Sequence, residues 1–180
     1  MTDYFVGVYW GPREESREAC AARISGFLVG LAKQDVALSQ WFEKVYSLKQ
    51  PRIPVPNTPE GLLPLLTMNR KDVGRREVIP DLGFHFSAWN GRKDGAAASV
   101  MALCGAYTPV ASNSAIVDFD REATPAADAL REILRSAIAV FDPDRGVVTS
   151  TESALALKVS RIWDAPALYR YQRGSGFSEG

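Results

Sequence analysis

The chain has 180 residues, of which 46% are hydrophobic and 23% are charged, a composition typical of one folded domain and not of a disordered chain. Lys+Arg and Asp+Glu number 21 each, so the charge balance does not favour a nucleic-acid or membrane-surface partner. No signal-peptide pattern and no apolar run near the ~20 residues of a membrane span is visible, which predicts a cytoplasmic protein.

The first predicted element is a strand over residues 4–10, where aromatic and β-branched side chains predominate. Apolar residues then recur every three or four positions, the period of a helix that packs by one face. Pro12 fits the first turn of that helix, so we expect the helix to begin there, with Glu14 and Glu15 near the positive end of its dipole. The residues predicted to face the core are Cys20, Ile24, Phe27, Leu28 and Leu31.

Trp10 and Arg13 lie where this strand passes into the helix. The residues alone favour a structural interpretation, in which the indole closes one end of the core and the guanidinium pairs with an acid, because helix starts need such closure. A role in contacting a ligand is the alternative.

The next part of the chain contains several prolines. Residues 37–45 are predicted to form either a short strand or an irregular segment that buries Trp41, and the alternate prolines of 50–57 exclude a helix interior and a central strand. The Thr-Pro pair at 58–59 predicts the start of a helix that leads into Leu62, Leu63, Leu65, Leu66 and Met68. Pro64 weakens the first turns of this helix, because a proline removes a helical donor. The charged residues 70–77 are predicted to be a helix end and a loop.

Three strands follow, over residues 82–89, 96–107 and 115–120, and polar turns separate them. Consecutive strands with short turns predict an antiparallel meander. A second long helix is predicted to begin at Thr124-Pro125 and to end at Asp142-Pro143.

The last predicted elements are a strand over 146–150, a short helix over 153–163, a strand over 167–171 and a flexible tail over 174–180. The sequence therefore predicts a single α+β domain over residues 1–173, built as an antiparallel or mixed sheet covered on one face by two long helices.

His85 is the only histidine. On the predicted strand it alternates with Phe84 and Phe86, which places it on the opposite face beside Ser87 and Trp89. A structural histidine is favoured, since no acid lies nearby in sequence to orient it. The alternative is a small hydrolase or transferase built around His85, which needs the fold to bring an acid or a cysteine to the imidazole.

Asp118 and Asp120 flank Phe119 on a predicted strand and could suit a divalent cation, and Asp142 and Asp144 flank Pro143 in a predicted turn. Neither pair belongs to a calcium-loop pattern. Structural roles are therefore favoured for them, because turn aspartates commonly bond their own backbone. Both cysteines lie in apolar runs and are predicted to be buried. With no phosphate loop and no dinucleotide fingerprint, the sequence predicts no cofactor, no metal site and no catalytic residue.

A set of short segments is shared with a known family. The segments are Gly7-Val8-Tyr9-Trp10-Gly11-Pro12-Arg13-Glu14, Cys20-Ala21 with Arg23, Trp41-Phe42-Glu43-Lys44, Leu82-Gly83-Phe84 with Trp89-Asn90-Gly91, and Cys104-Gly105. Together they resemble the immunity protein 52 family over most of the chain to about residue 150. The matched positions Tyr9, Trp10, Gly11, Arg13 and Trp89 are interpreted as fold residues, since immunity proteins tend to vary where they touch the toxin.

The resemblance implies a non-enzymatic inhibitor that binds and neutralises a cognate bacterial toxin by occlusion. Family members are encoded beside polymorphic toxins, notably ones with a restriction-endonuclease-like nuclease domain, and some of these toxins are delivered by type VI secretion. The resemblance implies no cofactor and no nucleic-acid or membrane partner, and we expect a monomer or a weak homodimer. An oligomeric scaffold is a further alternative.

A nuclease presents cations to its polyanionic substrate, so an inhibitor can offer carboxylates in place of that substrate. On this reasoning we expect an acidic edge that faces the toxin. Its predicted members are Asp118, Asp120, Glu122, Asp142 and Asp144.

Overall fold

The computed structural model describes residues 3–44, 52–68, 79–93, 95–150, 152–153 and 166–179. Within these residues the strands form one nine-stranded sheet in the order β2-β4-β5-β6-β1-β7-β8-β9, and β3 also pairs with β4. Every strand pairing is antiparallel. The strands are β1 (Tyr4–Trp10), β2 (Phe42–Glu43), β3 (Thr67–Met68), β4 (Phe84–Trp89), β5 (Ala98–Cys104), β6 (Asn113–Phe119), β7 (Arg145–Ser150), β8 (Ala167–Gln172) and β9 (Gly176–Glu179).

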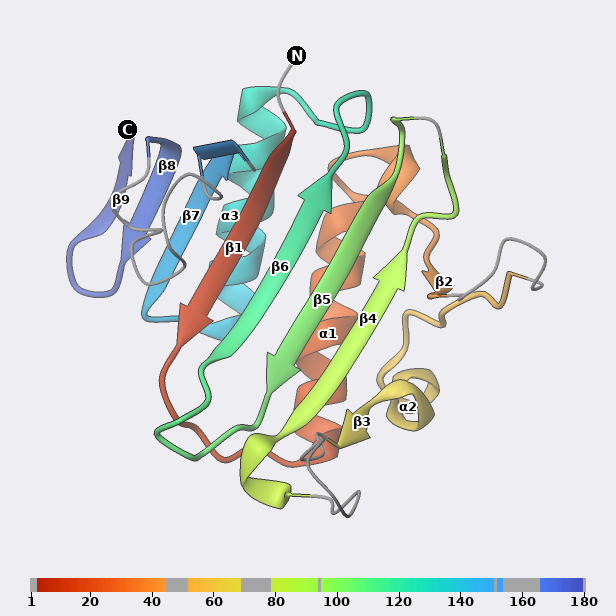
Figure 1. The fold of residues 1–180 in the computed structure, drawn as a ribbon, viewed down its shortest axis with the longest axis vertical. Coiled ribbons are helices and arrows are strands. Elements are labelled where there is room, and N and C mark those ends of the chain that lie inside the picture. The colour runs from red at the N-terminus through yellow and green to blue at the C-terminus, as the bar shows by residue number, and fades with distance from the viewer. Residues whose placement is uncertain are drawn as a thin grey trace.

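Two long helices, α1 (Arg17–Ala32) and α3 (Ala127–Phe141), lie on one side of this sheet (Figure 1). The predicted α+β class, the meander of β4, β5 and β6 and the covering by two long helices are confirmed. The two helices contact each other, and α3 contacts β1 and β7. The apolar stripes of both helices and one face of the sheet are buried against one another in a shared core. Buried side chains of this core include Val6, Val8, Ile24, Phe27, Phe86, Val100, Val117, Phe119, Ile133, Leu134 and Phe141.

The start of α1 differs from the prediction. The helix begins at Arg17, and its cap is Ser16, whose hydroxyl accepts the backbone N–H of Ala19 at 3.1 Å. The helix therefore begins after Pro12, Glu14 and Glu15. The Ser16 side chain accepts a free backbone N–H of the first turn, and a proline side chain has no group that can do so. The predicted inward-facing stripe from Cys20 to Leu31 is correct and fully buried.

The helix α2 (Pro59–Leu62) begins as predicted, with the Thr58 hydroxyl accepting the backbone N–H of Gly61. It ends at Leu62 and does not continue to Met68 as predicted, because Pro64 lacks a helical N–H and Thr67–Met68 pair with β4 as β3. Two 3₁₀ turns, η1 (Val36–Leu38) and η2 (Leu63–Leu65), flank the segment that contains buried Trp41. A third, η3 (Pro80–Leu82), leads into β4.

The second long helix starts later than expected. Its N-cap is Ala126, which makes no side-chain cap bond, and the Thr124 hydroxyl instead donates to the Asp120 carbonyl. The predicted apolar stripe is correct, since Leu130, Ile133, Leu134, Ala137 and Phe141 are all buried.

The C-terminal segment also differs from the prediction of a flexible tail over 174–180. Residues Gly176–Glu179 form β9, which pairs with β8 through a tight turn at Gly174, where φ is +86°. Glycine adopts this backbone conformation without strain, so the turn can return the chain as a hairpin. The predicted loop at 70–77 and most of the predicted helix at 153–163 lie outside the described residues.

A cluster of arginines holds the carboxyl end of α3. Arg13 donates from Nη2 to the Phe141 carbonyl at 2.7 Å and from Nη1 to the Asp142 carbonyl at 3.3 Å. Arg23 donates to the Val140 carbonyl, and Arg173 donates to the Asp142 carbonyl. These carbonyls form the negative end of the helix dipole and have no helical partner, so guanidinium groups stabilise them well.

The segment between β1 and α1 is fixed by the same cluster. Glu15, with a side chain only 8% exposed, lies 3.3 Å from Arg13 Nε and 2.6 Å from Arg23 Nε. The Trp10 ring stacks on Phe141 with 5.3 Å between ring centroids, and the Arg13 guanidinium lies 5.2 Å from the Trp10 centroid. The structural interpretation of Trp10 and Arg13 therefore agrees with their contacts.

Replacing Arg13 with alanine should destabilise the protein, because two carbonyls lose a charged donor. Hydrogen bonds to charged groups contribute about 1.5–3 kcal/mol, so we expect the unfolding free energy measured by urea denaturation to fall by about 2 kcal/mol. The control is Arg92→Ala on the exposed surface, where a change within about 0.5 kcal/mol is expected. Equal effects of the two variants would contradict the stabilising role of this cluster.

Candidate functional site

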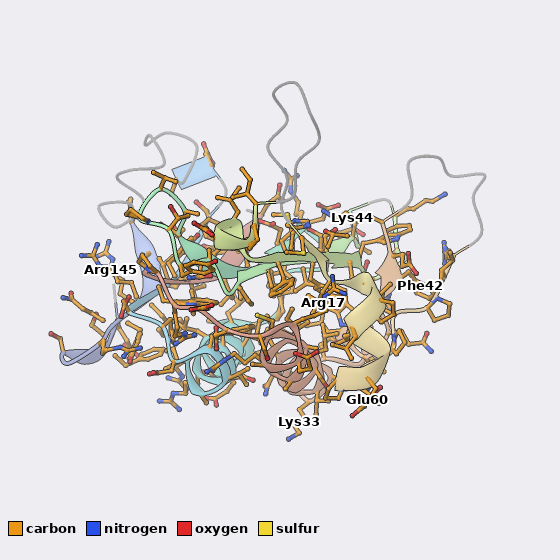
Figure 2. All side chains as sticks on the ribbon, turned by 90° about the horizontal axis from the view of Figure 1, so that it is seen from below. Arg17, Lys33, Phe42, Lys44, Glu60 and Arg145 are labelled. Carbon is orange, nitrogen blue, oxygen red and sulfur yellow. The ribbon has the colours of Figure 1, made fainter. Side chains whose placement is uncertain are left out.

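The sheet has a second face that α1 and α3 do not cover. In β5 and β6 every second residue is buried against the helices, and the alternate side chains point the other way. Figure 2 shows the sheet edge-on, with Lys33 and Glu60 on the helix side and Lys44 on the opposite side. We call this second surface the open face, and on β1 and β7 part of it is buried, at Phe5, Val147 and Thr149. On the three strands of the meander it carries His85, Ser87, Trp89, Ser99, Met101, Leu103, Ser114, Ile116 and Asp118.

One row of the open face forms a pocket. Trp89 on β4 pairs with Ser99 on β5, and Ser99 pairs with Asp118 on β6. Because adjacent strands lie about 4.8 Å apart, roughly 10 Å separates the backbones of Trp89 and Asp118, with the small serine between them. The pocket has a volume of about 340 Å³. Lys44, Trp89, Ala97, Ala98, Ser99, Asp118 and Asp120 line it.

Two contacts hold the indole of Trp89 in place. Its Nε1–H donates to the Glu43 carbonyl at 3.1 Å. The Arg52 guanidinium lies 5.7 Å from the centroid of the Trp89 ring and 5.9 Å from that of Phe42. These contacts fix a flat aromatic wall at one side of the pocket before any partner arrives.

The Asp118 carboxylate lies at the other side of the pocket. Burial raises its pKa above the ordinary value, the positive charge of Lys44 lowers it, and the negative charge of Asp120 raises it. Among the described residues none donates a hydrogen bond to this carboxylate. Among the described residues, the positive charge that stabilises the ionised Asp118 carboxylate is that of Lys44, which makes no ion pair with it.

Tyr9 lies on the open face of β1. Its ring folds back across Gly7, where an added Cβ atom would lie 2.7 Å from the Tyr9 Oη, so a larger residue at this position would force the ring to move. Burial, together with the negative charge of Asp118, raises the pKa of Tyr9 to about 12. The phenol therefore stays protonated at neutral pH.

His85 faces the same side of the sheet as predicted, in a smaller pocket with Glu43, Lys44, Leu65, Thr67 and Ser87. Burial and the positive charge of Lys44 lower the pKa of its imidazole. No acid or cysteine hydrogen-bonds to this imidazole among the described residues. Cys104, on the strand paired with β4, lies on the helix side, where its hydrogen bond with Cys20 raises its pKa. This arrangement gives no support to a catalytic histidine.

The five predicted toxin-facing carboxylates lie in two groups. Asp118, Asp120 and Glu122 lie at the end of the sheet where β1 begins, whereas Asp142 and Asp144 lie where β1 ends. The seven residues of β1 separate the two groups by roughly 20 Å. They therefore do not form one continuous edge, and their role in toxin binding stays a prediction.

The second group is occupied by contacts within the protein. Asp144 accepts the backbone N–H of Gly11 at 2.9 Å, and Asp142 and Asp144 lie 3.0 and 3.3 Å from Arg173. Asp142 also has a left-handed backbone, with φ of 47°, at the end of α3. Of the matched family positions, Trp10, Gly11 and Arg13 surround this group, while Tyr9 and Trp89 lie on the open face.

Sequence reasoning missed Lys44 and Ser99 as members of the pocket. Their places depend on the register between β4, β5 and β6 and on the path of the chain after β2. The one available signal was the run of small residues at 96–99, which leaves space beside larger neighbours.

Two other classes of site are not found in the described residues. No group of three or more His, Cys, Asp or Glu side chains there is arranged to hold a metal ion. None of the described helices has both the length and the apolar character needed to cross a membrane.

Replacing Asp118 with asparagine should leave the protein at least as stable at pH 7. The pKa of Asp118 in the folded protein lies above its unfolded value of about 3.9. The folded state therefore holds this proton more tightly, so Asp118 lowers the free energy of unfolding as the pH rises through the folded-state pKa, and this loss is absent at low pH. We expect the melting temperature of Asp118→Asn at pH 7 to equal or exceed that of the wild type by up to about 3 °C, with the difference narrowing toward pH 4. Glu60→Gln, on the exposed helix side, should show no such trend. Clear destabilisation by Asp118→Asn would show instead that the carboxylate stabilises the fold.

The comparisons with known proteins agree with the sequence resemblance. A search of curated proteins found no match. A family model described as Immunity protein 52 matches residues 2–169, which include Arg13 and Arg23 of the cluster at the end of α3 and every described residue that lines the pocket on the open face. Arg173 of the same cluster lies beyond the match. The chain therefore belongs to the Immunity protein 52 family.

Proposed function

We propose that this immunity protein neutralises its cognate toxin by covering it with the open face of the sheet. The observation that carries the proposal is that helices cover one face of the sheet, while the other presents a pocket with a fixed tryptophan and a half-buried carboxylate. Broad surfaces of this kind, with a rigid aromatic and charges at the rim, suit a protein partner.

The charge at one end of the open face supports a nuclease as the toxin. Asp118, Asp120 and Glu122 bring three carboxylates to the end of β6 and the turn after it, and Asp120 and Glu122 lie beyond the last residue of that strand. A nuclease binds nucleic acid through cations, and carboxylates on an inhibitor attract the same cations. Binding alone then keeps substrate out, so the mechanism needs no chemistry from the immunity protein.

The toxin encoded beside the gene provides the direct test. We expect the purified protein to form a 1:1 complex with that toxin domain at micromolar concentration or below in isothermal titration calorimetry, and to abolish nuclease activity at equimolar ratio. The charge-neutralised variant Asp120→Asn/Glu122→Gln should bind at least about tenfold more weakly, mainly through slower association. Absence of a complex at micromolar concentration would refute the proposal.

Changing His85 separates inhibition by binding from inhibition by catalysis. We expect His85→Gln to bind and inhibit the toxin within twofold of the wild type, because no described acid or cysteine activates its imidazole. A variant that still binds the toxin but no longer protects against it would instead favour an enzymatic mechanism around His85.

A further inference from the structure

We propose that the pocket between Trp89 and Asp118 receives the side chain of one arginine from the toxin. This inference rests on the proposed function and specifies the chemistry by which the open face recognises its partner. The guanidinium would lie against the indole of Trp89 and pair with the Asp118 carboxylate, with Asp120 at the rim.

The dimensions of the pocket suit a guanidinium on a long stem. Roughly 10 Å separates the strands that carry Trp89 and Asp118, and the floor between them is made of small residues, Ala97 and Ser99. Arginine combines a planar group that stacks on aromatic rings with a fork of donors that fits a carboxylate. Trp89 already has the Arg52 guanidinium 5.7 Å from its ring centroid, so the indole is suited to cation–π contact.

The charge of the pocket also selects a cation. Among the described residues that line the pocket, Asp118 and Asp120 bring two negative charges and Lys44 brings one positive charge, so their net charge is negative. Lys44 does not approach Asp118 within ion-pair distance among the described residues. The carboxylate is therefore partly desolvated and open to a better-placed cation, and a partner that closes the pocket would strengthen the attraction by excluding water.

The first test uses N-acetyl-arginine amide as a probe, without the toxin. In a heteronuclear NMR titration we expect saturable shifts of the Trp89 indole N–H and of the Asp118 and Ser99 amides, with a dissociation constant in the millimolar range. N-acetyl-citrulline amide, the neutral isostere, should give no saturable shift. Equal responses to the two probes, or no shift at Trp89, would overturn the inference.

Variants give the second arm of the test. Asp118→Asn should abolish the response to the arginine probe, and Ser99→Phe should do the same by filling the floor while keeping every charge. Lys44→Ala should bind the probe two- to fivefold more tightly, because it removes the competing cation; a merely structural lysine would not have this effect. Glu60→Gln, on the helix side, is the matched control and should bind as the wild type does.

The same variants are then measured against the toxin encoded beside the gene. We expect Asp118→Asn and Ser99→Phe to weaken the complex at least tenfold, with an unchanged far-UV circular dichroism spectrum. If both variants bind the toxin with an affinity within twofold of the wild type, this inference is overturned and the proposed function is left intact. Failure of the wild type to bind this toxin would overturn the proposed function, while the arginine titration would still decide the chemistry of the pocket.

Discussion

The structure depends on one constraint, which is that two helices cover only one face of a wide antiparallel sheet. Alternation along each strand then sends apolar side chains toward α1 and α3 and leaves the other set facing away from them. The covered face determines stability, because burial of its large side chains drives folding. The alternate side chains of β4, β5 and β6 on the open face can therefore vary their chemistry without dismantling the core.

The position of α3 on the sheet is fixed by contacts at its carboxyl end. Arg13, Arg23 and Arg173 come from three distant parts of the chain, and all donate to carbonyls at this end. Trp10 closes the same end by stacking on Phe141. Three of the matched family positions, Trp10, Gly11 and Arg13, lie at this junction, and their contacts are explained by the anchoring of α3. Recognition of a partner is proposed for a different surface.

The predictions from sequence succeeded where a short-range pattern decides the structure. The stripes of α1 and α3 and the alternation that turns His85 away from the helices follow from local periodicity. The predicted start of α1 was wrong, because Ser16 caps the helix and Pro12 precedes it. The sequence did not reveal β9, because the glycines before it resemble a flexible end and instead form a turn. The pocket could not be predicted, since it exists only once the register places Ser99 between Trp89 and Asp118. Similarly, the distance between the two acidic groups depends on the positions of β6 and β7 on either side of β1.

Asp118 is the residue at which stability and recognition oppose each other. A half-buried carboxylate with no described donor disfavours the folded state at neutral pH, and asparagine or threonine would fit the same strand position at lower energetic cost. Stability alone therefore gives no reason for an aspartate there. The desolvation that weakens the fold is also what makes this carboxylate attractive to a cation, because the attraction between charges grows as water is excluded. A residue that opposes folding in the free protein, placed opposite a fixed indole, is the basis for the proposed contact with a toxin arginine.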